Sequence, residues 1–147
     1  MRETSFAVGG YVVHRNRVLL LWHSDLGRWV PAGGRIQVGR GEYPHEALVR
    51  ELREECGIDV ELNRSSHIKF DDERVRLLPT PIAVQEITLD TGATYLDMVY
   101  FGRMVSDAVS LNYQEARAYH WFTYESLDSF PLMPHVRAYA RAALEDV

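Results

Sequence analysis

The sequence lacks three features that would each point to a particular class of protein. It has one cysteine, Cys56, among 147 residues, so no disulfide can form within the chain and a disulfide-stapled scaffold is excluded. No apolar run approaches the ~20 residues of a membrane-spanning helix. The first ten residues lack the apolar stretch of a signal peptide. We therefore expect a cytoplasmic protein with no membrane partner.

The chain also lacks an excess of positive charge. Lysine and arginine total 16 against 21 aspartates and glutamates, a formal net charge of −5 at pH 7. Broad binding to nucleic acid needs a basic surface, so we expect no stable nucleic-acid partner. There are no repeats, linkers or low-complexity segments. With 46% hydrophobic and 25% charged residues, the composition predicts a single folded domain over residues 1–147.

Hydrophobic patterning predicts an α/β fold with a mixed sheet. Two β-branched runs flank the polar turn at residues 14–17, which is a hairpin signal. Three later runs are typical of strands: 81–89, 94–105 and 116–124. Between the hairpin and the first helix, residues 27–42 contain Pro31 and five glycines, so we expect that segment to be largely loop.

Two helices are expected. Pro44 stands where the first turn of a helix tolerates proline, and strong helix formers follow as far as Gly57, which supplies a C-terminal stop. A last helix is expected from about Pro134 to Glu145, where apolar residues recur at helical spacing. A sheet with one early and one late helix predicts a layered α/β domain.

The first of these helices carries a cluster of carboxylates. Glu51, Glu54 and Glu55 lie at i, i+3 and i+4, so they share one side within an arc of roughly 100°. The apolar stripe of Leu48 and its helical neighbours runs beside this arc, which should place the carboxylates at the edge of the core. Their mutual repulsion there is unfavourable unless a cation or an arginine neutralises it. Oxygen ligands of this kind suit Mg²⁺ or Mn²⁺.

The alternative is a solvated helix face that happens to be acidic. In that case ion pairs at i, i+4, Glu46–Arg50 and Arg50–Glu54, would stabilise an exposed helix surface. The glycine-rich segment just before the helix, and the order of residues along it, favour a cation site.

The segment "RELREECGI", residues 50–58, resembles the second half of the Nudix box, the signature of the MutT-like Nudix hydrolases. Glu42 lies the required seven residues ahead of Arg50. Ile36 takes the place of the box glycine, and Gly34 lies two residues earlier. Two extra residues around Val38 to Arg40 explain this, because a loop tolerates them cheaply. Seven positions match the signature: Arg50, Glu51, Leu52, Glu54, Glu55, Gly57 and Ile58.

The resemblance implies an α/β/α sandwich with a mixed sheet between helices. It also implies metal-dependent hydrolysis of a diphosphate bond in a nucleoside diphosphate linked to another moiety, with Mg²⁺ or Mn²⁺ as cofactor and a small nucleotide as substrate. Its site residues would fall into three groups. The metal ligands would be Glu51, Glu55, Glu54 and Gly33 through its carbonyl. The catalytic residues would be Arg50, which orients a glutamate, and Glu54 or Glu115 as general base; the substrate-binding candidates are Gly34, Arg35 and Glu42.

Two rival functions stay open beside this one. The stretch "VPAGGRIQ" is similar to nucleotide-sugar hydrolases of the GDP-mannose type. A non-catalytic nucleotide-binding module of the same fold is the other rival, although such modules usually lose box glutamates that this chain keeps. The substrate is open, and so is assembly into a homodimer, which many members of that family form.

Overall fold

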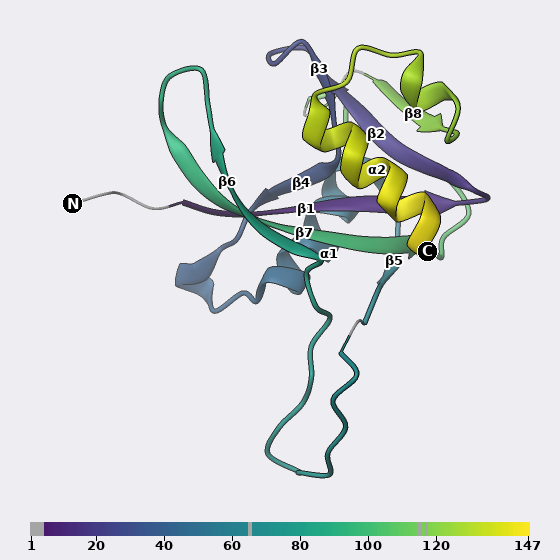
Figure 1. Ribbon diagram of the computed structural model, residues 1–147. Helices are drawn as coiled ribbons and strands as arrows, with labels where there is room; N and C mark the ends of the chain where they lie inside the picture. Colours follow the sequence, from purple (N-terminus) through teal and green to yellow (C-terminus); the bar gives the residue numbers. More distant parts are fainter. Residues whose placement is uncertain (1–4, 65, 115, 117) are drawn as a thin grey trace.

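The computed structural model describes residues 5–64, 66–114, 116 and 118–147, whose strands form one eight-stranded mixed sheet (Figure 1). The elements are, in chain order, β1 (Ser5–His14), β2 (Arg17–His23), β3 (Arg28–Val30), β4 (Ala32–Arg35), η1 (Val38–Arg40), α1 (Pro44–Cys56), β5 (Val60–Leu62), β6 (Ala83–Thr88), β7 (Thr94–Met104), β8 (Ala118–Phe122), η2 (Ser126–Asp128) and α2 (Pro134–Asp146).

Strands β1 and β7 form the middle of the sheet. They pair in parallel, from Ser5 opposite Tyr95 to Val13 opposite Arg103. The main order is β3-β2-β1-β7-β5, with β4 on β1, β6 on β7 and β8 on β2. These other pairings are antiparallel. The mixed sheet that the sequence predicts is therefore confirmed.

The two helices cover opposite faces of the sheet (Figure 1). Successive side chains of a strand point to opposite faces, so Val8 and Val12 of β1 pack with Leu48 and Leu52 of α1 on one face. Tyr11 and Val13 belong to the second core, which α2 closes with Val136, Ala140 and Ala143. The α/β/α arrangement is confirmed. Neither helix of the described part of the chain is long and apolar enough to span a membrane.

Local signals locate the hairpin and the first helix correctly. Arg15 and Asn16 have φ of 50° and 61°, which is the backbone of a two-residue turn that matches the twist of β1 and β2. Helix α1 begins at Pro44 and ends at Cys56. Gly57 follows with φ of 62°, and its amide donates to the carbonyls of Arg53 and Leu52. Only a residue tolerant of the left-handed region closes a helix in this way.

The prediction that residues 27–42 are largely loop is wrong. They contain β3, β4 and the short helix η1, and β4 pairs with β1. A Cβ added to Gly33 would lie 2.1 Å from the carbonyl oxygen of Val8, so this glycine permits close approach of two strands and does not mark a flexible loop. Val38 to Arg40, around which two extra residues are expected, form η1, and α1 begins at Pro44 as predicted.

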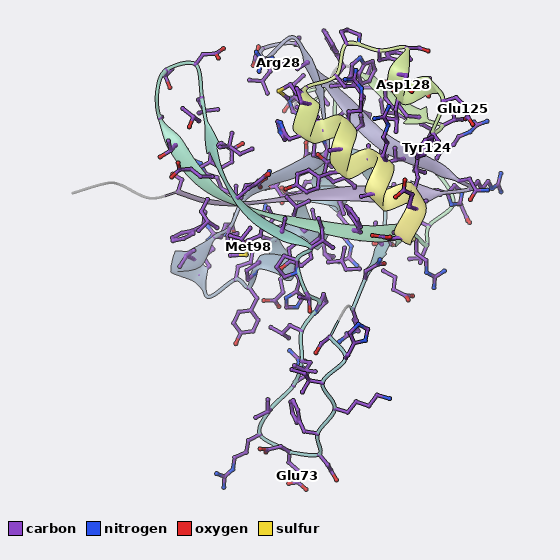
Figure 2. All side chains as sticks on the ribbon, viewed as in Figure 1. Arg28, Glu73, Met98, Tyr124, Glu125 and Asp128 are labelled. Carbon is purple, nitrogen blue, oxygen red and sulfur yellow. The ribbon has the colours of Figure 1, made fainter. Side chains whose placement is uncertain are left out.

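The amino-terminal end of α2 lies next to β3. Nη1 of Arg28 is 3.2 Å from Sδ of Met133, the residue before α2 (Figure 2). In the same view Glu73 marks the tip of the long connection between β5 and β6, which extends away from the sheet.

Candidate active site

The glutamates of α1 form a gradient from core to solvent. The side chain of Glu55 is 3% exposed, that of Glu51 is 15% exposed and that of Glu54 is 51% exposed. All three come from the side of α1 that lies beside its apolar stripe. The prediction that the carboxylates lie at the edge of the core is confirmed.

Glu55 ties α1 to β4. Its Oε1 accepts a hydrogen bond of 2.9 Å from the backbone amide of Gly33. Its Oε2 lies 3.7 Å from Nε2 of His23 at the end of β2. A buried carboxylate is costly unless it is hydrogen-bonded, and here a strand amide meets that need while fixing the orientation of the carboxylate.

Glu51 packs directly on Gly34. A Cβ added to Gly34 would lie 2.5 Å from both Cδ and Oε1 of Glu51, so glycine is what lets the carboxylate lie against β4. Burial raises the pKa of Glu51, and the neighbouring charges of Glu55 and Glu54 raise it further against the opposing effect of Arg50. The cluster is therefore short of positive charge.

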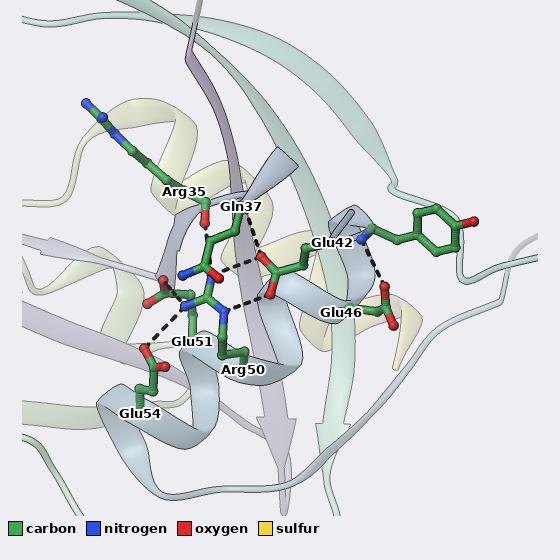
Figure 3. Close-up of polar contacts among 8 residues, drawn as sticks. Arg35, Gln37, Glu42, Glu46, Arg50, Glu51 and Glu54 are labelled. Atoms are coloured by element: carbon green, nitrogen blue, oxygen red, sulfur yellow. Dashed lines mark hydrogen bonds and ion pairs between the residues drawn. The ribbon is translucent and has the colours of Figure 1, made fainter. Parts of the chain in front are cut away.

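Arg50 is the centre of a hydrogen-bond network (Figure 3). Nε and Nη2 donate to the two oxygens of Glu42, at 2.8 and 3.0 Å. Nη1 donates to Glu51 at 2.9 Å and to Glu54 at 3.3 Å. Nη2 also donates to the carbonyl of Arg35, at 3.0 Å. One guanidinium thus holds three carboxylates and β4 in a fixed relation.

Glu42 belongs to this network. Besides Arg50, its Oε1 accepts from the backbone amide of Gln37 at 2.9 Å. The hydrogen bond from Arg50 is the main reason why its pKa is lowered. Glu42 therefore braces Arg50 against the segment before α1. Its predicted contact with substrate stays a prediction.

The alternative of a solvated acidic face is only partly realised. The Arg50–Glu54 pair exists, but Glu46 accepts from the backbone amide of Tyr43 at the start of α1 and does not pair with Arg50. The Glu46–Arg50 pair that this alternative predicts does not form, because the carboxylate of Glu46 accepts from the nearer amide at the helix start.

The donor set suits a hard divalent cation. Arg50 bonds the carboxylates of Glu42, Glu51 and Glu54, and a fourth carboxylate, that of Glu55, bonds the amide of Gly33 on the same side of α1. Within the described ranges, no three His, Cys, Asp or Glu side chains are arranged to hold a metal ion, and Nη1 of Arg50 bonds both Glu51 and Glu54. The raised pKa of Glu51 nevertheless marks a cluster that more positive charge would stabilise.

A cavity of about 710 Å³ lies beside the cluster. Its wall includes Gly33 and Gly34, on which the cluster packs, together with His23 and Arg35. It continues along β1, β6 and β7 to the start of α2, where Asp97 and His135 line it. Ligand sites for small molecules commonly have this size, so the cavity is large enough for a nucleotide.

The sequence analysis missed a second polar group in this cavity. Asp97 of β7 is 9% exposed, and its Oδ2 accepts a hydrogen bond of 3.0 Å from the side-chain amide of Gln85. The hydroxyl of Tyr139 in α2 donates to the carbonyl of that amide at 2.8 Å. Strand periodicity contained the signal, because Asp97 shares a face with Tyr95 and Val99.

The structure brings together most of the residues predicted for the site. Gly33, Gly34, Glu42, Arg50, Glu51, Glu54 and Glu55 meet at the junction of α1 and β4. Arg35 contributes its carbonyl, and its exposed side chain lines the cavity while pointing away from the network (Figure 3). Glu115, the second candidate base, lies outside the described residues.

Comparisons with known proteins agree with this architecture. The family model described as NUDIX domain matches residues 4–144. A NUDIX-family hydrolase from Clostridium perfringens is 27% identical, with a TM-score of 0.87 and 97% of each chain covered. A MutT NUDIX hydrolase from Burkholderia pseudomallei is 24% identical, with a TM-score of 0.68 and 99% of each chain covered. An ADP-ribose pyrophosphatase from Streptococcus suis is 21% identical, with a TM-score of 0.63, over 97% of this chain and 91% of that one. Among curated proteins, none matches the chain.

Proposed function

Because the chain belongs to the NUDIX family, we propose that it hydrolyses a diphosphate bond in a nucleoside diphosphate linked to another moiety, with Mg²⁺ or Mn²⁺ as cofactor. It is a Nudix pyrophosphohydrolase, and its substrates are small nucleotides. One observation carries the proposal: Glu51, Glu54 and Glu55 share one side of α1, and two of them contact Gly33 and Gly34, which line a cavity of nucleotide size.

Glu51 and Glu55 would be the principal ligands of the cation, with Glu54 and the carbonyl of Gly33 completing the set. A divalent cation supplies the charge that stabilises a diphosphate under attack and makes water a better nucleophile. Support comes from the donor chemistry, because clustered carboxylates with one shared guanidinium favour a hard dication over zinc.

The residues of the chain position the reactants and move the proton. Arg50 holds Glu51 and Glu54 through one nitrogen, so it is a positioning residue for both. Water attacks phosphorus, the bridging P–O bond breaks, and the proton of the water passes to a carboxylate. Glu54 is our first candidate for that base, since it is the most exposed of the three and its hydrogen bond from Arg50, at 3.3 Å, is the longest in the network. Glu115 remains the second.

The rival functions have less support. In a non-catalytic module the lengthened loop would be expected to occlude the site. Val38 to Arg40 instead form η1, and none of them lines the cavity. The stretch that resembles GDP-mannose hydrolases contains Gly33 and Gly34, whose contacts are explained by Glu55 and Glu51. Intact carboxylates beside an accessible cavity favour hydrolysis at phosphorus.

A substrate panel tests the proposal. Nucleoside triphosphates, nucleotide sugars, dinucleoside polyphosphates and ADP-ribose are incubated with Mg²⁺ or Mn²⁺, and the nucleotide products are separated and measured by ion-exchange chromatography. Glu51→Gln and Glu55→Gln should each lower kcat on the best substrate by roughly 10²- to 10³-fold, because charge stabilisation of the transition state is lost. Glu73→Gln, an exposed change at the tip of the β5–β6 connection, is the matched control. Wild-type rates in both box variants, or no turnover of any panel member by the parent, would refute the proposal.

A further inference from the structure

Asp97 is a buried carboxylate in the wall of the cavity. It lies in β7 between Ala7 of β1 and Gln85 of β6, its partners in the sheet. Only 9% of the residue is exposed, and it lies on the face of the sheet that α2 covers. The cavity that it lines is also lined by Gly33 and Gly34, the glycines that Glu55 and Glu51 contact.

The surroundings of Asp97 leave its charge unbalanced. Its direct hydrogen-bond partner is the neutral amide of Gln85, at 3.0 Å. Within the residues that the structure describes, no arginine or lysine forms an ion pair with it. His135 interacts with it electrostatically, but burial lowers the pKa of that imidazole and so favours its neutral form. A buried carboxylate with so little compensation destabilises the fold.

One oxygen of Asp97 is held in place and the other is available to a ligand. The Tyr139 hydroxyl donates to the carbonyl of Gln85, which orients the amide nitrogen toward Oδ2 of Asp97. Among the described residues, no protein group donates a hydrogen bond to Oδ1. Oδ1 lies 3.9 Å from where a Cβ of Gly9 would stand, so the absence of a side chain at Gly9 leaves space beside it. An ionised carboxylate only accepts hydrogen bonds, and the ligand group that fits beside Oδ1 is therefore an N–H or O–H donor.

The donor belongs to the base end of a nucleotide and not to its phosphates. Phosphate groups carry negative charge and would be repelled by Asp97. Gly33, Gly34 and Arg35, which line the cavity near the proposed cation ligands, belong to β4 and not to β7. Besides His135, the cavity wall on this side of the sheet includes the uncharged side chains of Tyr11, Val30 and Val99. Such surfaces suit a flat heterocycle, with one polar group fixing its orientation.

Resting on the proposed hydrolysis of a nucleotide substrate, we propose that Asp97 determines specificity by accepting a hydrogen bond from the exocyclic amino group of the nucleobase. The substrate class is then nucleotides of guanine, adenine or cytosine. A base that carries a carbonyl or a hydrogen at that position is rejected, since a carbonyl would face the carboxylate acceptor to acceptor and a hydrogen would leave Oδ1 unpaired. Gln85 and Tyr139 are positioning residues that keep the carboxylate in place.

Three matched pairs of nucleotides test this: GDP with IDP, ADP with IDP, and CDP with UDP. Each pair differs in one exocyclic amino group, which is a hydrogen in IDP compared with GDP and a carbonyl beside a protonated ring nitrogen in the second member of the other two pairs. Binding is measured by calorimetry without divalent cation, which separates base recognition from turnover. The wild-type protein should prefer the amino member of one pair by roughly 10- to 100-fold. Asp97→Asn should abolish or reverse that preference, because the amide can donate to a carbonyl. Asp71→Asn, with the same charge change in the exposed β5–β6 connection, should leave it intact.

Two further readouts keep the test decisive. Tyr139→Phe removes the hydroxyl that orients Gln85 and should weaken the preference several-fold, so it replaces Asp97→Asn if that variant does not fold. Three outcomes would each overturn the inference. They are equal or undetectable binding across all three pairs, a wild-type preference for the nucleotide that lacks the amino group, and a preference that survives in Asp97→Asn. Absence of metal-dependent turnover with the binding preference intact would instead overturn only the proposed hydrolysis.

Discussion

Adjacent glycines in β4 should respond to alanine in opposite ways. Gly33 faces backbone: its added Cβ would lie 2.1 Å from the carbonyl oxygen of Val8 in the paired strand β1. Gly34 faces the movable end of a side chain, the carboxylate of Glu51. Gly33→Ala should therefore damage the fold, whereas Gly34→Ala should damage the site and leave the fold nearly intact.

The magnitudes follow from the contacts. A clash with a strand backbone cannot relax by side-chain rotation, so Gly33→Ala should cost about 3 kcal/mol or more, the upper end for overpacking. For a chain of this length that lowers Tm by roughly 6–12 °C. In Gly34→Ala, Cδ of Glu51 must move from 2.5 Å to at least 3.4 Å, which is an ordinary contact. A misplacement of about 1 Å at a catalytic group lowers the rate by roughly 10²-fold, or about 2.7 kcal/mol.

Thermal unfolding and steady-state kinetics on the best panel substrate measure the two effects separately. Gly39→Ala is the control in the same segment, because its Cβ would meet no atom within 4 Å and it should change neither quantity. The reasoning fails if Gly34→Ala keeps wild-type kcat, or if Gly33→Ala unfolds at the wild-type temperature. A large loss of stability in Gly34→Ala would show that Glu51 cannot retreat.

Three other results are expected. Arg50→Lys cannot donate two parallel bonds to Glu42, so unfolding should be easier by about 1.5–3 kcal/mol, and an unchanged denaturant midpoint would contradict the network. Burial raises the pKa of Asp97 in the folded state. As pH rises from the usual carboxyl range through the folded pKa, the buried carboxyl group ionises, and the contribution of Asp97 to the free energy of unfolding falls. Asp97→Asn should therefore be the more stable protein at pH 8 but not at pH 3, and an equal difference at both would exclude this origin. Mg²⁺ at ten times its Kd should raise Tm by roughly 3–6 °C, whereas a flat scan would count against a folded cation site.

Features with local causes were predictable from the sequence. The limits of α1 follow from Pro44 and Gly57, and the β1–β2 turn follows from a short polar interruption between two apolar runs. The carboxylates of α1 share a side because of helical spacing alone. Each of these depends on residues within a few positions of one another, where propensity and periodicity act.

Features that depend on distant partners were not predictable in the same way. The glycines of β4 look like loop residues until β1 is placed beside them, because their role is to permit contact with Val8 and Glu51. The hydrogen-bond chain Tyr139–Gln85–Asp97 joins α2, β6 and β7, and no residue spacing within one element predicts it. The local signal for this chain was Asp97 itself, an acidic residue between Leu96 and Met98 in a mostly apolar strand.

The parallel pairing of β1 with β7 has a consequence for how the chain acquires its fold. Ser5 pairs with Tyr95, so the middle of the sheet cannot form until most of the chain exists. During synthesis at roughly 5–20 residues per second, the β1–β2 hairpin waits about 5–20 s with one edge of β1 unpaired. Contacts of such long sequence separation also make folding slow. Nascent chains should therefore depend on chaperones that shield strand edges, and refolding yield should fall steeply with protein concentration.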